Sequence, residues 1–126
     1  MPKEIHAAPS GPAPIGPYSV VAEANGLVFL SGQVGIDPAS NLPAGEDVQT
    51  QTHQVMRNIG AILADVALGY DDIVKTTIFL ADIGDFPIVN AVYGEYVGDA
   101  KPARSTIEAG GLPGGFRVEI EVIAAR

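Results

Sequence analysis

The spacing of apolar residues along this chain changes from a period of two to a period of about 3.6 and back, and it does so twice. A period of two is typical of a strand, because successive side chains point to opposite faces, whereas 3.6 is typical of a helix. The order of predicted elements is ββ-α-β-α-ββ. This order predicts an α+β domain in which two helices pack on one face of a single mixed β-sheet.

Five segments have the character of strands. Asn25-Gly26 separates the first two, and this pair favours a tight hairpin because both residues tolerate positive φ. The third segment is rich in β-branched residues, and the fifth begins with strict alternation of apolar and polar residues. The predicted strands are Tyr18–Ala24, Leu27–Gln33, Ile73–Ala81, Arg104–Ala109 and Phe116–Ala125. Within the second of them, Gly32 marks a place where another group can approach the backbone closely.

Two segments have apolar residues at helical spacing. The first begins after Asp47, a good N-cap residue, and Gly69 is the predicted stop. The second begins at Asp85 with Pro87 in its first turn, and Pro102 prevents its continuation. The predicted apolar faces are Val55, Met56, Ile59, Ile62, Leu63 and Val66 in the first helix, and Val89, Val92, Tyr93, Tyr96 and Val97 in the second.

Residues 1–126 form a single predicted domain. Residues 1–14 are predicted to be an extended N-terminal arm, because the segment from Ala7 to Pro17 contains four prolines. Residues 35–46 are predicted to be a turn-rich connection, and the Gly-rich stretch GGLPGG at 110–115 is predicted to be a loop between strands.

The charge and composition exclude several classes of function. The net charge of −8 opposes binding to nucleic acids and to anionic membranes, and no apolar run is long enough to span a bilayer. Only 17% of the residues are charged, against roughly 25% in ordinary globular proteins, which predicts that other subunits cover part of the apolar surface. The absence of cysteine and of an apolar signal segment leads us to expect a cytoplasmic protein.

The chain offers few residues for metal or cofactor binding. It has no cysteine and only two histidines, His6 in the predicted arm and His53 in the first helix, so we predict no metal site. The stretch 110–115 lies between two strands and not at a helix N-terminus, so we interpret it as a turn, not as a phosphate-binding loop. The sequence therefore predicts no cofactor.

Arg104 is the most informative polar residue, because it lies at the start of a strand in an apolar segment. A guanidinium group binds planar carboxylates in a bidentate manner and keeps its charge. The alternative is an internal salt bridge with an acidic residue, and the sequence alone does not decide between the two. The candidate partners for that salt bridge are Glu108, Glu119 and Glu121.

The chain resembles the Rid family, the reactive intermediate deaminases, also called the YjgF family. The resemblance extends over nearly all of the chain from Ile15 onward, and its specificity lies in the combination of motifs. The matching segments are IGPYS at 15–19, LSGQ at 30–33, IVKTTIFLADIGDF at 73–86, VNAVY at 89–93, PARSTIE at 102–108 and VEIEVIA at 118–124.

This resemblance implies a chorismate-mutase-like fold and a homotrimer with active sites between subunits. It also implies hydrolysis of reactive enamines and imines, such as 2-aminoacrylate, to 2-keto acids and ammonia, without a cofactor. The substrates would be 2-iminopropanoate, 2-iminobutanoate and related small acids. By this resemblance Arg104 binds the substrate carboxylate and Glu119 orients the attacking water. The positions that match cleft-lining residues of the family are Tyr18, Gly32, Asn90 and Thr106.

Two other functions remain open at this stage. The same site could serve a pathway-specific deaminase that acts on an aminomuconate-type intermediate. Alternatively, the chain could be a non-catalytic member of the family, a ligand-binding regulator or a chaperone. A role in RNA cleavage is disfavoured by the net charge of −8.

Overall fold

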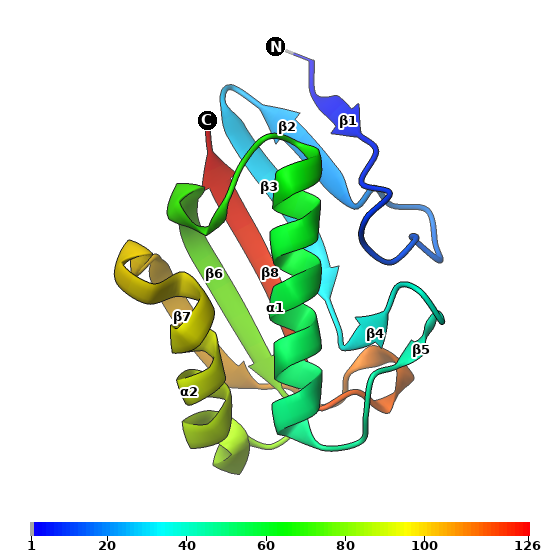
Figure 1. Cartoon of the computed structure of the whole chain (residues 1–126), viewed down its shortest axis with the longest axis vertical. Helices are drawn as coiled ribbons and strands as arrows, with labels where there is room; N and C mark the ends of the chain where they lie inside the picture. Colours follow the sequence, from blue (N-terminus) through cyan, green and yellow to red (C-terminus); the bar gives the residue numbers. More distant parts are fainter. Residues whose placement is uncertain (1) are drawn as a thin grey trace.

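The computed structural model of the chain describes residues 2–126, and its centre is a six-stranded β-sheet (Figure 1). The strand order is β1-β2-β3-β8-β6-β7, and only the pair β6 and β7 is parallel, so the sheet is mixed as predicted. The strands are β1 (Glu4–His6), β2 (Val21–Ala24), β3 (Leu27–Gln33), β6 (Ile73–Leu80), β7 (Ala103–Glu108) and β8 (Val118–Ala125). A small hairpin of β4 (Ile36–Asp37) and β5 (Leu42–Pro43) lies outside this sheet.

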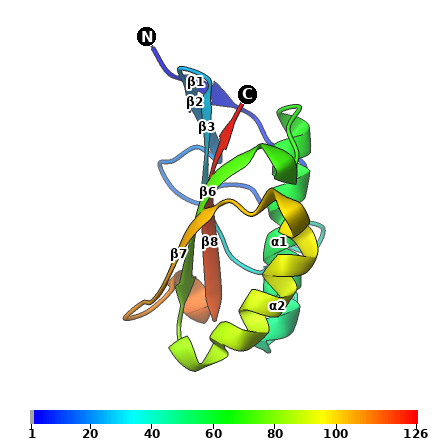
Figure 2. The same ribbon diagram turned by 90° about the vertical axis from the view of Figure 1, so that its left-hand side faces the viewer.

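Both helices, α1 (Val48–Asp65) and α2 (Phe86–Val97), cover the same face of the sheet (Figure 2). Asp47 is the N-cap of α1, and its carboxylate accepts a hydrogen bond of 2.9 Å from the backbone N–H of Thr50. The predicted fold class is therefore confirmed. No helix within residues 2–126 combines the length and the apolar character needed to cross a bilayer.

Helix α1 ends at Asp65, before the predicted stop at Gly69. The left-handed residue after the helix is Ala67, with φ of 63°, and the N–H of Leu68 then bonds the carbonyl of Leu63 at 2.8 Å. This arrangement satisfies the last carbonyl groups of the helix. The sequence pattern placed the stop too late because it assigned the left-handed position to a glycine.

The hydrophobic core lies between the sheet and the two helices. It includes every residue of the predicted apolar face of α1 and the inward-facing residues of β8. The residues of this core with no measurable exposure include Val55, Ile59, Ile62, Leu63, Ile78, Leu80, Val118 and Ile120. Burial of these side chains stabilises the fold, since each contributes about 1.5–3 kcal/mol when fully removed from water.

The opposite face of the sheet carries apolar side chains that residues 2–126 leave partly exposed. Leu27 and Phe29 of β3 are each 41% exposed, and Ile107 of β7 is 50% exposed. Phe79 and Ile123 point to the same face in the strand register and are only partly buried. The sequence-based prediction of a partly apolar, uncovered sheet face is therefore confirmed.

The N-terminal segment is more ordered than the predicted extended arm at 1–14. Residues Glu4 to His6 form the edge strand β1 on β2, and Ser10 donates a 2.7 Å hydrogen bond to Asp65 at the end of α1. Strand β2 begins at Val21, three residues later than predicted. A strand of three residues is too short to show a periodicity, which is why the sequence pattern missed β1.

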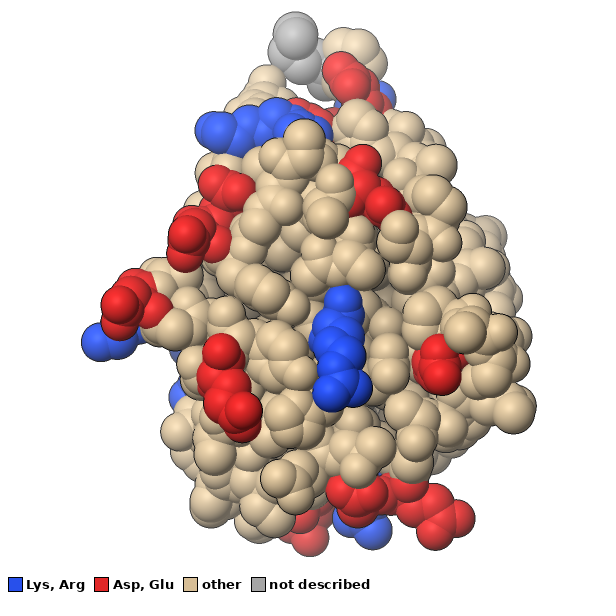
Figure 3. All heavy atoms as spheres, viewed as in Figure 1, with Lys and Arg blue, Asp and Glu red and all other residues tan. Residues whose placement is uncertain are grey.

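Charged side chains are sparse on the helix-bearing side of the molecule, and the basic ones stand apart from one another (Figure 3). The whole chain has seven basic and fifteen acidic residues. A continuous basic patch of the kind that binds phosphate backbones is not formed on this face.

Candidate active site

Arg104 lies on β7, at the edge of the sheet, and its side chain points toward α2. Its Nη1 donates a 2.8 Å hydrogen bond to Oδ1 of Asn90, and its guanidinium carbon lies 5.4 Å from the Phe86 ring centre and 5.2 Å from that of Tyr93. Such contacts orient the guanidinium and add cation–π stabilisation. Phe86, Asn90 and Tyr93 follow one another at helical spacing, so a single face of α2 positions the arginine.

No carboxylate within residues 2–126 forms an ion pair with Arg104. Glu108, one candidate partner, instead accepts a 2.9 Å hydrogen bond from the backbone N–H of Ile83. The alternative of an internal salt bridge for Arg104 is therefore wrong. A guanidinium that is held in place without an anionic partner is available to bind an external carboxylate.

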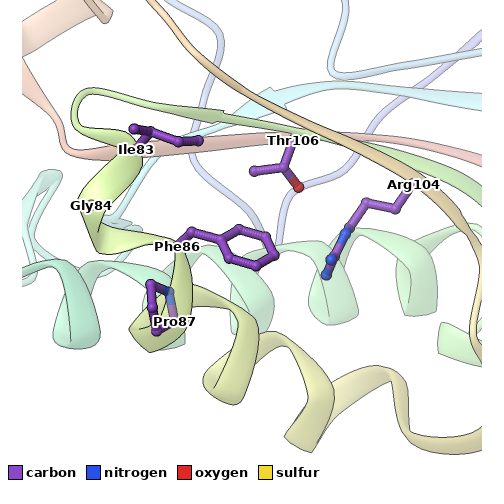
Figure 4. A pocket seen from close by; sticks show the side chains of 6 residues that line it. All are labelled: Ile83, Gly84, Phe86, Pro87, Arg104 and Thr106. Atoms are coloured by element: carbon purple, nitrogen blue, oxygen red, sulfur yellow. The ribbon is translucent and has the colours of Figure 1, made fainter.

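A cavity of about 630 Å³ opens beside Arg104 (Figure 4). Thr106, two residues further along β7, faces the same cavity, and its hydroxyl is buried without a hydrogen-bond partner among the described residues. The lining residues are Ile83, Gly84, Phe86, Pro87, Arg104 and Thr106. The cavity therefore has a cationic end, formed by the arginine, and walls that are mostly apolar.

A second cavity, of about 490 Å³, contains the predicted residues Tyr18, Gly32 and Glu119. Glu121 lies two residues beyond Glu119 on β8 and lines the same cavity. Burial raises the pKa of the Glu119 carboxyl above its ordinary value, and the nearby charge of Glu121 raises this pKa further. A carboxylate with a raised pKa is well suited to exchange protons with a substrate near neutral pH.

Gly32 is required for the position of the Glu119 carboxylate. The register between β3 and β8 shifts between Leu30 and Gln33, so Gly32 lies at an irregularity of this strand pair. A Cβ atom built on Gly32 would lie 2.9 Å from Cδ of Glu119. The close approach predicted at Gly32 is therefore confirmed, and the group that approaches is the Glu119 side chain.

The two groups of predicted site residues lie on opposite faces of the sheet. Arg104 pairs with Thr76 in the register of β7 and β6, and Thr76 pairs with Val122 in the register of β6 and β8, so the three side chains share one face. Thr76 and Val122 are buried under the helices, so this is the helix-covered face. Glu119 precedes Val122 by three residues, and an odd separation in a strand places two side chains on opposite faces. The structure therefore forms two separate groups of predicted site residues. Arg104, Asn90 and Thr106 lie together, and Tyr18, Gly32 and Glu119 lie together. The two groups do not meet within one chain.

Within residues 2–126 one group of side chains has the spacing that could hold a metal ion, namely Glu4, His6 and Glu23, whose potential ligand atoms lie within 4.8 Å of one another. Nε2 of His6 is 2.8 Å from Glu23, and Arg126 donates a 2.9 Å hydrogen bond to the same carboxylate. These contacts join β1, β2 and the C-terminus, so we interpret the group as one that holds these three segments together. His6 thus lies in a paired strand and not in the extended arm that the sequence predicts.

Several residues that line the two cavities were not predicted from the sequence, among them Phe86, Ile83 and Glu121. Phe86 could have been found, because it lies four residues before Asn90 and seven before Tyr93 on one helical face. Ile83 belongs to a short irregular segment and shows no pattern. Glu121 lies on the polar side of an alternating strand, a pattern that is also typical of a solvated face.

Comparisons with known proteins identify the family of the chain. The family model described as Endoribonuclease L-PSP matches residues 8–126. Reactive Intermediate Deaminase A, chloroplastic, from Arabidopsis thaliana is 45% identical over 97% of this chain and 65% of its own length. The 2-iminobutanoate/2-iminopropanoate deaminase of Mus musculus is 38% identical over 98% of this chain and 92% of its own length. The crystal structure of E. coli TdcF with bound serine superimposes with a TM-score of 0.91, at 33% identity, over 98% of each chain.

The chain therefore belongs to the endoribonuclease L-PSP family, which is the Rid or YjgF family that its sequence resembles. Its fold of two helices on a mixed sheet is the fold of the solved structures of this family. Relatives at about 40% identity are named as deaminases, so the chain is similar to enzymes of this class.

Proposed function

We propose that this protein is a deaminase that hydrolyses 2-imino acids and their enamine forms, such as 2-iminopropanoate, 2-iminobutanoate and 2-aminoacrylate, to 2-keto acids and ammonia. The observation that carries the proposal is the guanidinium of Arg104, which forms no ion pair with the described residues and which Asn90, Phe86 and Tyr93 hold beside a cavity. Named deaminases among the relatives support the same activity.

Arg104 binds the substrate carboxylate. Nη1 is already engaged with Asn90, so the remaining N–H groups are available to a planar anion in a bidentate arrangement. This pair fixes the adjacent imine carbon relative to the protein, and such positioning supplies much of the rate enhancement of a bimolecular reaction. A neutral imine without a carboxylate lacks this anchor.

Glu119 orients and deprotonates the attacking water. The water oxygen bonds to the carbon of the protonated imine as one water proton passes to the Glu119 carboxylate, and the electron pair of the C=N bond stays on nitrogen, which becomes a neutral amine. Glu119 then returns this proton to the amine, and the C–N bond of the tetrahedral adduct breaks. The adduct's hydroxyl proton passes to the departing ammonia, which leaves as ammonium, and the 2-keto acid remains. One carboxyl group that accepts and returns a proton is sufficient for both steps.

We propose that each active site lies between two subunits of a homotrimer. Arg104 and Glu119 are on opposite faces of one sheet, so one substrate can contact both only if they come from different chains. The uncovered apolar face with Leu27, Phe29 and Ile107 supplies the surface that subunits would bury against one another. The low content of charged residues, 17%, supports the same assembly.

The experiment that tests the proposed function measures imine hydrolysis directly. An amino-acid oxidase generates 2-iminopropanoate from alanine, semicarbazide traps the imine, and the purified protein is added in increasing amounts. We expect the rate of semicarbazone formation to fall as the protein competes for the imine. Unchanged semicarbazone formation at all protein concentrations would refute the proposed deaminase activity.

Replacement of Glu121 by Gln should move the acid side of the pH–activity profile to lower pH. Glu119 must be ionised to accept a proton, so activity is lost as the pH falls through its pKa, which lies above the ordinary value of 4.5. Removal of the Glu121 charge lowers this pKa, and the burial contribution remains. The measurement is kcat/KM from about pH 4 to 8. Glu95→Gln, which removes one exposed charge from α2, is the control and should leave the profile in place.

Replacement of Gly32 by Ala should lower kcat/KM by about 10–100-fold. The new Cβ would displace the Glu119 carboxylate, and a catalytic group misplaced by about 1 Å lowers the rate by a factor of this order. Substrate binding at Arg104 should persist, so the loss should be in kcat. Gly94→Ala is the matched control, since a Cβ at Gly94 meets no atom within 4 Å. Equal activity of the two variants would show that the position of Glu119 does not matter.

A nuclease is disfavoured despite the family's description. The net charge of −8 and the seven basic residues give little attraction for a phosphate backbone. The two cavities offer a single arginine, Arg104, and two carboxylates, Glu119 and Glu121, which suit a small zwitterion better than a polyanion.

A further inference from the structure

Gln51 is a polar residue of α1 whose side chain is almost fully buried. It is 4% exposed, although glutamine residues are mostly found at protein surfaces. A buried amide requires hydrogen-bond partners for both its oxygen and its nitrogen. Gln51 lines neither the cavity beside Arg104 nor the cavity beside Glu119, so contact with a substrate does not account for its position.

The amide of Gln51 joins two segments that are far apart in the sequence. Its Oε1 accepts a 2.8 Å hydrogen bond from the backbone N–H of Arg117, and its Nε2 donates a 3.0 Å hydrogen bond to the carbonyl of Gly45. A backbone N–H can only donate and a carbonyl can only accept, so these two partners fix the orientation of the amide. Gln51 thus connects the residue that precedes β8 with the segment between β5 and α1.

The beginning of β8 has little other support on one side. Glu119 pairs with Phe79 of β6, but on the β3 side the register of the described residues reaches only the pair of Gln33 and Ile120. The backbone that leads to Glu119 from the N-terminal direction is therefore not held by β3. The hydrogen bond from Arg117 to Gln51 holds it from the side of the helices.

The loop that precedes β8 needs such an anchor. Residues 110–115 include four glycines, and Gly114 and Gly115 both have φ of 72°. Glycine loses more conformational freedom on folding than any other residue, so an ordered glycine-rich loop depends on contacts at its ends. The loop is orange in Figure 1, and its last residues line one surface depression together with Gln51 and Gly45.

Helix α1 is itself fixed against the segment that carries the small hairpin. A Cβ atom built on Gly35 would lie 3.0 Å from Cα of Gln51, so the two backbones pack directly against each other. Two turns further along α1, Asn58 donates a 2.8 Å hydrogen bond to the carbonyl of Ile36. The helix is therefore a rigid support from which Gln51 can hold the beginning of β8.

We propose that Gln51 is a positioning residue for Glu119. It fixes the backbone at Arg117, and Glu119 lies two residues further along the same strand. This proposal rests on the proposed deaminase function, in which Glu119 exchanges protons with the attacking water. Loss of the Gln51 contacts displaces the Glu119 carboxylate and leaves Arg104 in place, so kcat falls and KM does not change.

Replacement of Gln51 by Leu, which is of similar size, removes both hydrogen bonds. We expect kcat to fall about 10–100-fold, the effect of misplacing a catalytic group by about 1 Å, and KM to stay within about twofold of the wild-type value. The melting temperature should fall as well, by roughly 5–10 °C, because Arg117 and Gly45 each lose a partner. Both kinetic constants come from semicarbazide competition, at a temperature where circular dichroism shows the variant to be folded.

Two further variants separate positioning from stability. Val55 is fully buried one turn further along α1, and Val55→Ala should lower the melting temperature by leaving a cavity but keep kcat within about twofold of wild type. Gln51→Glu has the same length, and its carboxyl oxygen accepts the Arg117 N–H in either protonation state. It should therefore retain kcat within about threefold of wild type. If Gln51→Leu does not fold, Gln51→Asn takes its place, since its shorter amide cannot reach both Gly45 and Arg117.

The outcomes distinguish this proposal from the function on which it rests. If wild-type protein hydrolyses 2-iminopropanoate and the Leu or Asn variant has an unchanged kcat, the role of Gln51 is refuted and the deaminase stands. An equal loss of kcat in Val55→Ala or in Gln51→Glu would refute it too, because the loss would not depend on the contact with Arg117. If wild-type protein hydrolyses no imine, the proposed function itself is refuted, and the role of Gln51 with it.

Discussion

Replacement of Arg104 by Ala is expected to lower kcat/KM for imine hydrolysis by roughly 10²–10⁴-fold. Two charge-assisted hydrogen bonds to the substrate carboxylate contribute about 1.5–3 kcal/mol each, and 1.4 kcal/mol corresponds to a factor of ten. The fold should persist, because Arg104 makes one side-chain hydrogen bond, to Asn90, and forms no ion pair with the described residues. Semicarbazide competition measures the activity, and thermal unfolding measures the fold.

Arg104→Lys separates charge from geometry in the same experiment. A lysine keeps the positive charge but has neither the planar fork nor the stacking of the guanidinium between Phe86 and Tyr93. We expect this variant to be severely impaired. Full turnover by Arg104→Ala would show that the carboxylate is bound elsewhere.

Replacement of Glu119 by Gln is expected to lower kcat by roughly 10²–10⁴-fold, the usual contribution of general acid–base catalysis. KM should change little because Arg104 still binds the carboxylate. Measurement of kcat and KM over a range of imine concentrations tests this split. A large rise in KM with unchanged kcat would assign Glu119 to binding and not to proton transfer.

The same variant has a predicted effect on stability. Burial raises the pKa of Glu119 in the folded protein above its unfolded value of about 4.5, so the ionised carboxylate destabilises the fold at neutral pH. This destabilisation disappears as the pH falls below about 4.5, where the carboxyl group is protonated in both states. Glu119→Gln should therefore raise the melting temperature at pH 8 and leave it unchanged near pH 4. A lowered melting temperature at pH 8 would contradict the conclusion that the ionised Glu119 carboxylate destabilises the fold.

The sequence predicted the layers of the fold because they depend on local periodicity. The apolar faces of α1 and of strand β8 are repeated patterns, and both are buried as expected. The end of α1 and the edge strand β1 were missed, since Ala67 takes a left-handed conformation that its identity does not reveal and β1 is only three residues long. Short elements depend on pairing with distant residues, and local sequence carries little information about such pairing.

The candidate site could be predicted residue by residue but not in its spatial arrangement. The motif around Arg104 and the strand that carries Glu119 are recognisable in the sequence, and Gly32 could be identified as a place of close approach. That Arg104 and Glu119 face opposite sides of the sheet follows only from the register of β6, β7 and β8. Long-range register is set by the whole fold, so the strand patterns alone could not show that these two residues lie on opposite faces; the site between subunits was expected only from the family resemblance.

Mixed oligomers test the proposed shared site most directly. Arg104→Ala and Glu119→Gln chains, each almost inactive alone, are unfolded together in equal amounts and refolded, with each variant refolded alone as the control. If every site takes Arg104 from one chain and Glu119 from its neighbour, about a quarter of the sites contain both wild-type residues, since each is wild type with a chance of about one half. We therefore predict recovery of about a quarter of the wild-type activity. Native mass spectrometry that shows mixed oligomers without any recovered activity would contradict a site built from two subunits.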